Sequence, residues 1–152
     1  MSDAKKILVS LENESPFSMK VLNCAAEFAE KLGGRLVVLS IVPYSPYHTS
    51  MDGMASEDLI RQALEKVRSE VEVSAKKIIE GDARLKSLVA TSIVVIGDVA
   101  DKILEIADKE NVQMIVVGKN CSGAECRILG SAAFGLVQRS RTPIVVIPSD
   151  EE

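Results

Sequence analysis

The stretch GDVADKILEIADKENVQMIVVG, residues 97–118, decides the fold because its apolar residues change period halfway along. Over 97–111 they recur at helical spacing, with Val99, Ile103, Ile106 and Ala107 on one side. Residues 114–118, MIVVG, are an unbroken apolar run of the kind found in strands buried on both faces. A helix that leads directly into a buried strand is the repeating half of an α/β domain.

The same alternation extends in both directions along the chain. Apolar runs predict strands at 6–11, 35–42, 88–96, 114–118 and 143–148. Helical spacing predicts helices from Pro16, ended by Gly33-Gly34, and over 56–80, 97–111 and 131–139. In the helix over 56–80 the predicted apolar stripe is Leu59, Ala63, Val67, Val71 and Ile78.

This order predicts an α/β fold of Rossmann-like type, an open five-stranded, mostly parallel sheet with helices on both faces. Ligands of such sheets bind beyond the carboxyl ends of the strands, where the strand order reverses. At those ends stand the segments 11–15, 42–46, 97–98 and the glycine-containing stretch 118–131.

Length and charge limit the class of protein. The 152 residues fit one domain, 1–152, with 43–55 as a flexible loop and 149–152 as a frayed tail. A net charge of −4 argues against general nucleic-acid binding, and no apolar run reaches the length of a membrane span. Without a signal-peptide core, a cytoplasmic location is expected.

Cysteine and histidine are sparse. The three cysteines, Cys24, Cys121 and Cys126, do not suggest a disulfide framework, and with a single histidine, His48, no metal site is expected. Cys121 and Cys126 are interpreted as ordinary thiols and Cys24 as a core residue. The segment that carries His48, Tyr44 and Tyr47 is either a lid over the site or a locally packed loop.

The stretch GKNCSGAECRILGS, 118–131, raises the question of phosphate binding. Gly130-Ser131 opens a helix, whose free N–H groups and dipole attract anions, and Ser131 can donate a hydroxyl. The alternative is that Ser131 only caps its helix and Gly130 makes the turn. Neither a Walker A motif nor a Rossmann glycine fingerprint is present.

At this point three segments carry a resemblance to a known family. The segments KKILVSLENES, GDVADKILEIADKENVQMIVVGKN and LGSAAFGLVQRSRTPIVVIP resemble the universal stress protein family. That resemblance spans essentially the whole chain, although 43–85 matches only in character. It implies a five-stranded α/β domain, usually a homodimer, from one of two subgroups, of which only one binds ATP.

The resemblance also implies a set of nucleotide-binding residues. The family's glycine loop matches Gly118 and Gly130-Ser131, but the interval is one residue short. Asn120 or Cys121 falls in the slot of the second glycine, and Gly123 lies nearby. Glu12 stands where the ATP-binding subgroup has aspartate, and Ile41 maps to backbone groups that read adenine. The residues beside these positions complete the set: Leu11, Val117 and Ala132.

Two functions are therefore expected in order of preference. The first is an adenine-nucleotide-binding protein, holding ATP with Mg, that has a regulatory or stress-response role. The second is a dimeric interaction module without nucleotide. A slow ATP hydrolase ranks last, because no general acid–base pair or activated nucleophile is visible.

Two further expectations concern the dimer and Asp98. The homodimer would pair through the last strand, an edge strand with residues Pro143, Ile144, Val145, Val146 and Ile147. Asp98 is either the N-cap of its helix or, together with Glu12, a group that meets a ribose hydroxyl or a metal-bound phosphate.

Overall fold

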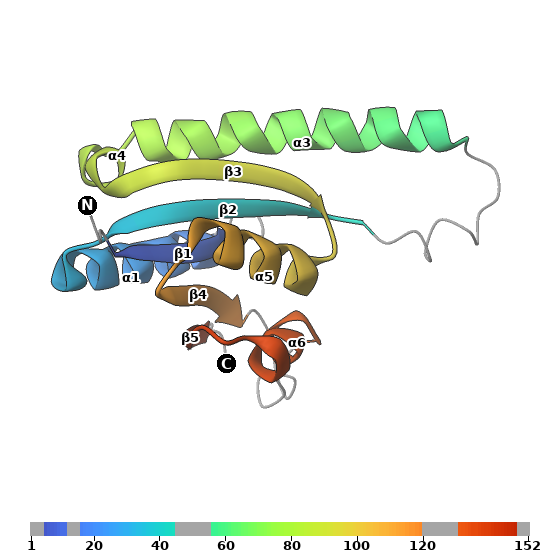
Figure 1. Ribbon diagram of the computed structural model, residues 1–152. Helices are drawn as coiled ribbons and strands as arrows, with labels where there is room; N and C mark the ends of the chain where they lie inside the picture. The colour runs from blue at the N-terminus through green and yellow to red at the C-terminus, as the bar shows by residue number, and fades with distance from the viewer. Residues whose placement is uncertain (1–4, 12–15, 45–55, 120–130, 149–152) are drawn as a thin grey trace.

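The protein is an α/β domain whose five strands form one open sheet (Figure 1). The computed structural model describes residues 5–11, 16–44, 56–119 and 131–148. The strands are β1 (Lys6–Leu11), β2 (Arg35–Pro43), β3 (Val89–Gly97), β4 (Met114–Lys119) and β5 (Ile144–Pro148). Their order in the sheet is β3-β2-β1-β4-β5, and every pairing is parallel, which confirms the predicted fold class.

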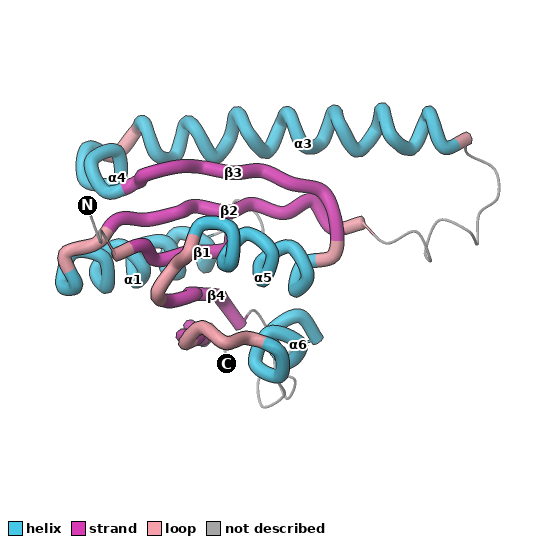
Figure 2. Tube along the Cα trace, viewed as in Figure 1, coloured by secondary structure: helices cyan, strands magenta, loops and turns pink. Residues whose placement is uncertain are grey.

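The helices cover both faces of this sheet (Figure 2). They are α1 (Pro16–Leu32), α3 (Glu57–Glu80), α4 (Ala83–Leu88), α5 (Val99–Glu110) and α6 (Ser131–Arg139). Alternate strand residues point to opposite faces, so the sheet has two hydrophobic cores. One core joins Val9, Val38 and Val116 to α1 and α4, and the other joins Leu8, Val37 and Ile115 to α5 and α6.

The sequence pattern placed most of these elements correctly, with differences of one or two residues at several ends and one helix missed. Helix α4 was not predicted, and it begins where Asp82 accepts hydrogen bonds from the backbone of Arg84 and Leu85. Strand β2 runs through Pro43, one residue further than expected, because Pro43 is still in register with Gly97 of β3.

The predicted inward stripe of α3 is wrong over the first half of the helix. Leu59 and Val67 are 59% and 42% exposed, and Ala63 is also exposed. The buried residue of α3 is Ala75, one position that the stripe omitted. Helix α3 contacts β3, the edge strand, and β2, so only a narrow face of it meets the sheet. The second half of the stripe was predicted correctly, since Val71 and Ile78 are half-buried on the same face as Ala75.

At the amino end of the sheet, side-chain and backbone hydrogen bonds connect the strand starts to neighbouring elements. Gly33, in the left-handed region with φ of 67°, ends α1, and Gly34 follows it with its N–H bonded to Ala29 O at 2.8 Å. The Gln113 side chain accepts from Lys6 N at 2.6 Å. Arg35 donates to the Val89 carbonyl at 3.0 Å, which ties β2 to the start of β3. The strand starts are thus joined across the sheet by hydrogen bonds.

Candidate functional site

The carboxyl end of the sheet contains a break in its central ladder. Strands β1 and β4 pair through only three residues each, and the last pair is Val9 with Val116. Strand β1 continues to Leu11 along β2, and β4 continues to Lys119 along β5. We call the residues beyond that last pair, Ser10–Leu11 and Val117–Lys119, the strand split. It lies where the strand order reverses, which is the position at which parallel α/β sheets bind ligands.

The predicted site residues of the strands do meet at this end, but on two different faces. Ile41 and Val117 belong to the core under α5 and α6, whereas Leu11 belongs to the core under α1. The three side chains are 5–8% exposed, so they are almost entirely buried in the protein. What they present at the strand ends is therefore chiefly backbone.

Gly118 has a packing role that the sequence did not reveal. A Cβ at this position would lie 2.8 Å from the Phe17 ring and 2.9 Å from Val21 Cγ2. Both residues lie on α1, so the glycine lets the first turns of that helix approach the end of β4. Packing against α1 alone therefore requires glycine at position 118, whether or not this residue contacts a phosphate.

Two charged residues mark the limits of the site. Asp98 is the N-cap of α5, where its carboxylate accepts from Asp101 N at 3.0 Å. It follows β3, which is two strands, or about 10 Å, away from β1. On the other side, the Lys20 ammonium on α1 donates to the Pro148 carbonyl at 3.2 Å, which places a cation beside the end of β5.

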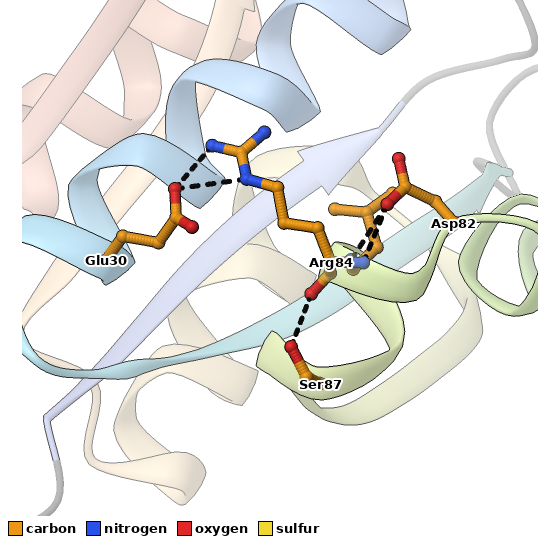
Figure 3. A network of polar contacts seen from close by, with 5 residues as sticks. Glu30, Asp82, Arg84 and Ser87 are labelled. Carbon is orange, nitrogen blue, oxygen red and sulfur yellow. Dashed lines mark hydrogen bonds and ion pairs between the residues drawn. The ribbon is translucent and has the colours of Figure 1, made fainter.

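A polar network around Arg84 lies away from the strand split, at the opposite end of the sheet; Figure 3 shows its side chains. Arg84 of α4 donates through two nitrogens, at 3.0 and 2.6 Å, to one carboxylate oxygen of Glu30 in the last turn of α1. The hydrogen bond from Arg84 lowers the pKa of Glu30 below its ordinary value of 4.5. This network joins two helices and has no part in the strand split.

Several residues named in the sequence analysis, predicted site residues among them, lie outside the described residues. They are Glu12, Asn120, Cys121, Gly123, Cys126, Gly130, and His48 with Tyr47. Ser131 and Ala132 form the start of α6, as expected, and Ala132 is half-buried. Tyr44 follows β2 and is also half-buried, with its N–H bonded to the Gly97 carbonyl at 3.1 Å.

Sequence reasoning overlooked one polar residue inside the site. Ser10 is the first residue of β1 after the last pair with β4, and it is 7% exposed. The available signal was a single hydroxyl near the carboxyl end of the otherwise apolar run ILVSL. Among the described residues no group of three or more His, Cys, Asp or Glu side chains is placed to hold a metal ion.

This is a doubly wound, all-parallel α/β domain whose central strands separate at the reversal of strand order. The model of the universal stress protein family matches residues 4–148, and the chain belongs to that family. It is 29% identical over 147 residues to the universal stress protein YxiE of Bacillus subtilis, covering 93% of this chain and 97% of that protein.

Solved structures of the family share the fold. Universal stress protein UspA from Lactobacillus plantarum superposes with a TM-score of 0.70 at 16% identity, over 97% of this chain and 99% of that one. The universal stress protein from Archaeoglobus fulgidus, solved in complex with dAMP, gives a TM-score of 0.56 at 20% identity, over 94% and 97% of the two chains.

None of the helices in the described ranges combines the length and the apolar character that a bilayer span requires.

Proposed function

We propose that the protein binds an adenine nucleotide at the strand split and acts as a nucleotide-responsive regulator in a stress response. The observation that carries this proposal is the early end of the β1–β4 ladder, at the reversal of strand order. Family membership and the dAMP complex of the Archaeoglobus fulgidus relative support an adenine nucleotide as the ligand.

The nucleotide would lie across the ends of three neighbouring strands. Ile41 of β2 and Val117 of β4 would flank it through their backbones, with Leu11 and Glu12 at the end of β1. Gly118, Gly123, Gly130, Ser131 and Ala132 would hold the phosphates of ATP. Without an acidic cluster among the described residues, Mg would be held mainly by the phosphates themselves.

The test is a calorimetric titration of nucleotide-stripped protein with Mg-ATP. We expect a Kd of about 100 μM or tighter, which corresponds to roughly 5.5 kcal/mol. Gly130→Ala should weaken binding, because a methyl group would obstruct phosphates at the start of α6. The matched control is Gly135→Ala in the same helix, where a Cβ meets Ala100 at an ordinary 3.5 Å. No heat and no competition at millimolar ATP would overturn the proposal.

A homodimer is the second proposal, and the surface near β5 favours it. Strand β5 is an edge of the sheet, so Ile144–Pro148 offers backbone groups to another chain. Helix α6, which leads into β5, leaves Phe134 and Val137 52% and 54% exposed. Light scattering should give twice the chain's 16.4 kDa. A mass of one chain at micromolar concentration would contradict pairing through Pro143–Ile147.

A further inference from the structure

Ser10 combines three properties that set it apart from the rest of β1. It is more than nine-tenths buried, it is polar, and it follows directly on the last residue that pairs with β4. Leu8, two residues earlier, belongs to the core under α5, so by strand alternation the Ser10 side chain lies on that same face. Ile41 and Val117 are members of that core too. Ser10 is therefore the polar residue between two apolar ones on neighbouring strands.

The Ser10 hydroxyl has no hydrogen-bond partner within the part of the chain that the structure describes. Within those same residues, every side-chain nitrogen or oxygen that is fully sealed from solvent has a hydrogen-bond partner. The Ser10 oxygen is therefore not fully sealed, even though the residue as a whole is only 7% exposed. A buried hydroxyl that forms no hydrogen bond with the protein can form one with a ligand.

We propose that the Ser10 hydroxyl forms a hydrogen bond with one ribose hydroxyl of the nucleotide, and so favours the nucleotide that carries this hydroxyl over the deoxy analogue that lacks it. The inference rests on the proposed function. In the proposed function Ile41 of β2 flanks the base, and the phosphates lie at the loop that follows β4. The strand order puts β1 between β2 and β4. The Ser10 hydroxyl therefore faces the middle of the nucleotide, which is the sugar.

The test combines a protein change with a ligand change. Ser10→Ala should weaken ATP binding about threefold to tenfold, the usual effect of losing one hydrogen bond. Both proteins are also titrated with 2′-deoxy-ATP and 3′-deoxy-ATP. One of these analogues lacks the hydroxyl that Ser10 contacts, and wild type and Ser10→Ala should bind that analogue with the same affinity. Ser40→Ala is the matched control, because Ser40 is equally buried at 5% on the neighbouring strand. Its side chain lies on the opposite face, with Val38, so ATP affinity should not change.

Each outcome decides between the two proposals. An equal loss for ATP and both deoxy analogues, or no loss at all, would overturn the role of Ser10 and leave nucleotide binding intact. Absence of nucleotide binding by the wild type would overturn both. Without nucleotide, Ser10→Ala should be as stable as wild type or more so, since no protein hydrogen bond is lost. A clear loss of stability would mean that the hydroxyl serves the fold.

Discussion

The two ends of the sheet are built differently. At the amino end, Lys6 N donates to the Gln113 side chain and Arg35 donates to the Val89 carbonyl at the start of β3. The Lys6 ammonium donates to Glu110 of α5, and the Arg84–Glu30 pair joins α4 to α1. At the carboxyl end the β1–β4 ladder stops, and Ser10 keeps a hydroxyl without a described partner. The comparison teaches that the polar side chains at the amino end are used to join elements, whereas the polar side chain nearest the break in the ladder is not.

The largest effect expected from breaking the amino end is at Gly34. A Cβ there would lie 2.6 Å from the Lys5 carbonyl oxygen, which is backbone and cannot easily move. Gly34→Ala should lower the free energy of unfolding by about 2–3 kcal/mol, as overpacking does. Urea unfolding would measure it.

Gly33→Ala is the matched control for that change. Gly33 has the left-handed φ of 67°, but a Cβ added there would meet nothing within 4 Å, so only the conformational cost of about 1 kcal/mol remains. Equal losses at the two glycines would show that the contact with Lys5 is not what requires glycine at 34.

A smaller effect is expected at the carboxyl end from Gly118→Ala. The methyl group would press on the Phe17 ring, which can shift, so the loss should be about 1–2 kcal/mol. In a Phe17→Leu background, Gly118→Ala should lower the free energy of unfolding by less, because the aromatic ring that the methyl group would contact is absent. Chemical unfolding of the four proteins of this cycle measures the coupling.

Nucleotide titration of the same four proteins sharpens the comparison of the two ends. If Gly118 also contacts phosphate, the Phe17→Leu/Gly118→Ala double variant should bind nucleotide weakly even though its stability is partly restored. If stability and nucleotide affinity recover together, Gly118 has a packing role alone.

The smallest effect concerns Glu30 and depends on pH. Because Arg84 lowers the pKa of Glu30, the ionised carboxylate stabilises the folded state. That contribution is present above the unfolded pKa and is lost as pH falls through the lower folded pKa. Thermal unfolding of wild type and Glu30→Gln should therefore differ slightly at pH 7, and the difference should shrink as the pH falls through the lowered pKa of Glu30. In an Arg84→Met background, a difference that persists at pH 7 would contradict this account.

The sequence predicted the alternation of elements because each is a local pattern of apolar residues. It missed α4, whose six residues show too little of a helical period to be recognised. In the first half of α3 it assigned exposed residues, Leu59, Ala63 and Val67, to the inward stripe, because the sequence does not show how far along the helix the contact with the sheet extends. Local patterns do not encode such contacts between distant elements.

The position of the candidate site could be predicted from the sequence, but the packing of its residues could not. Its position followed from the order of strands and helices, and Leu11, Ile41, Val117 and Gly118 do lie at the carboxyl ends. The contact of Gly118 with Phe17 joins residues a hundred positions apart, so no local motif could show it. Ser10 was overlooked because one serine in an apolar strand has no distinctive spacing.

The short β1–β4 ladder also has a mechanical consequence. Three register pairs join these strands, against six for β1–β2, five for β4–β5 and eight for β2–β3. The weakest seam therefore runs through the middle of the sheet, whereas sheets generally fray from their edges. Helix α1, which packs on β1, β2 and β4, is the main brace across it. A molecule bound at the strand ends would contact both halves of the sheet and would therefore act as a second brace between them.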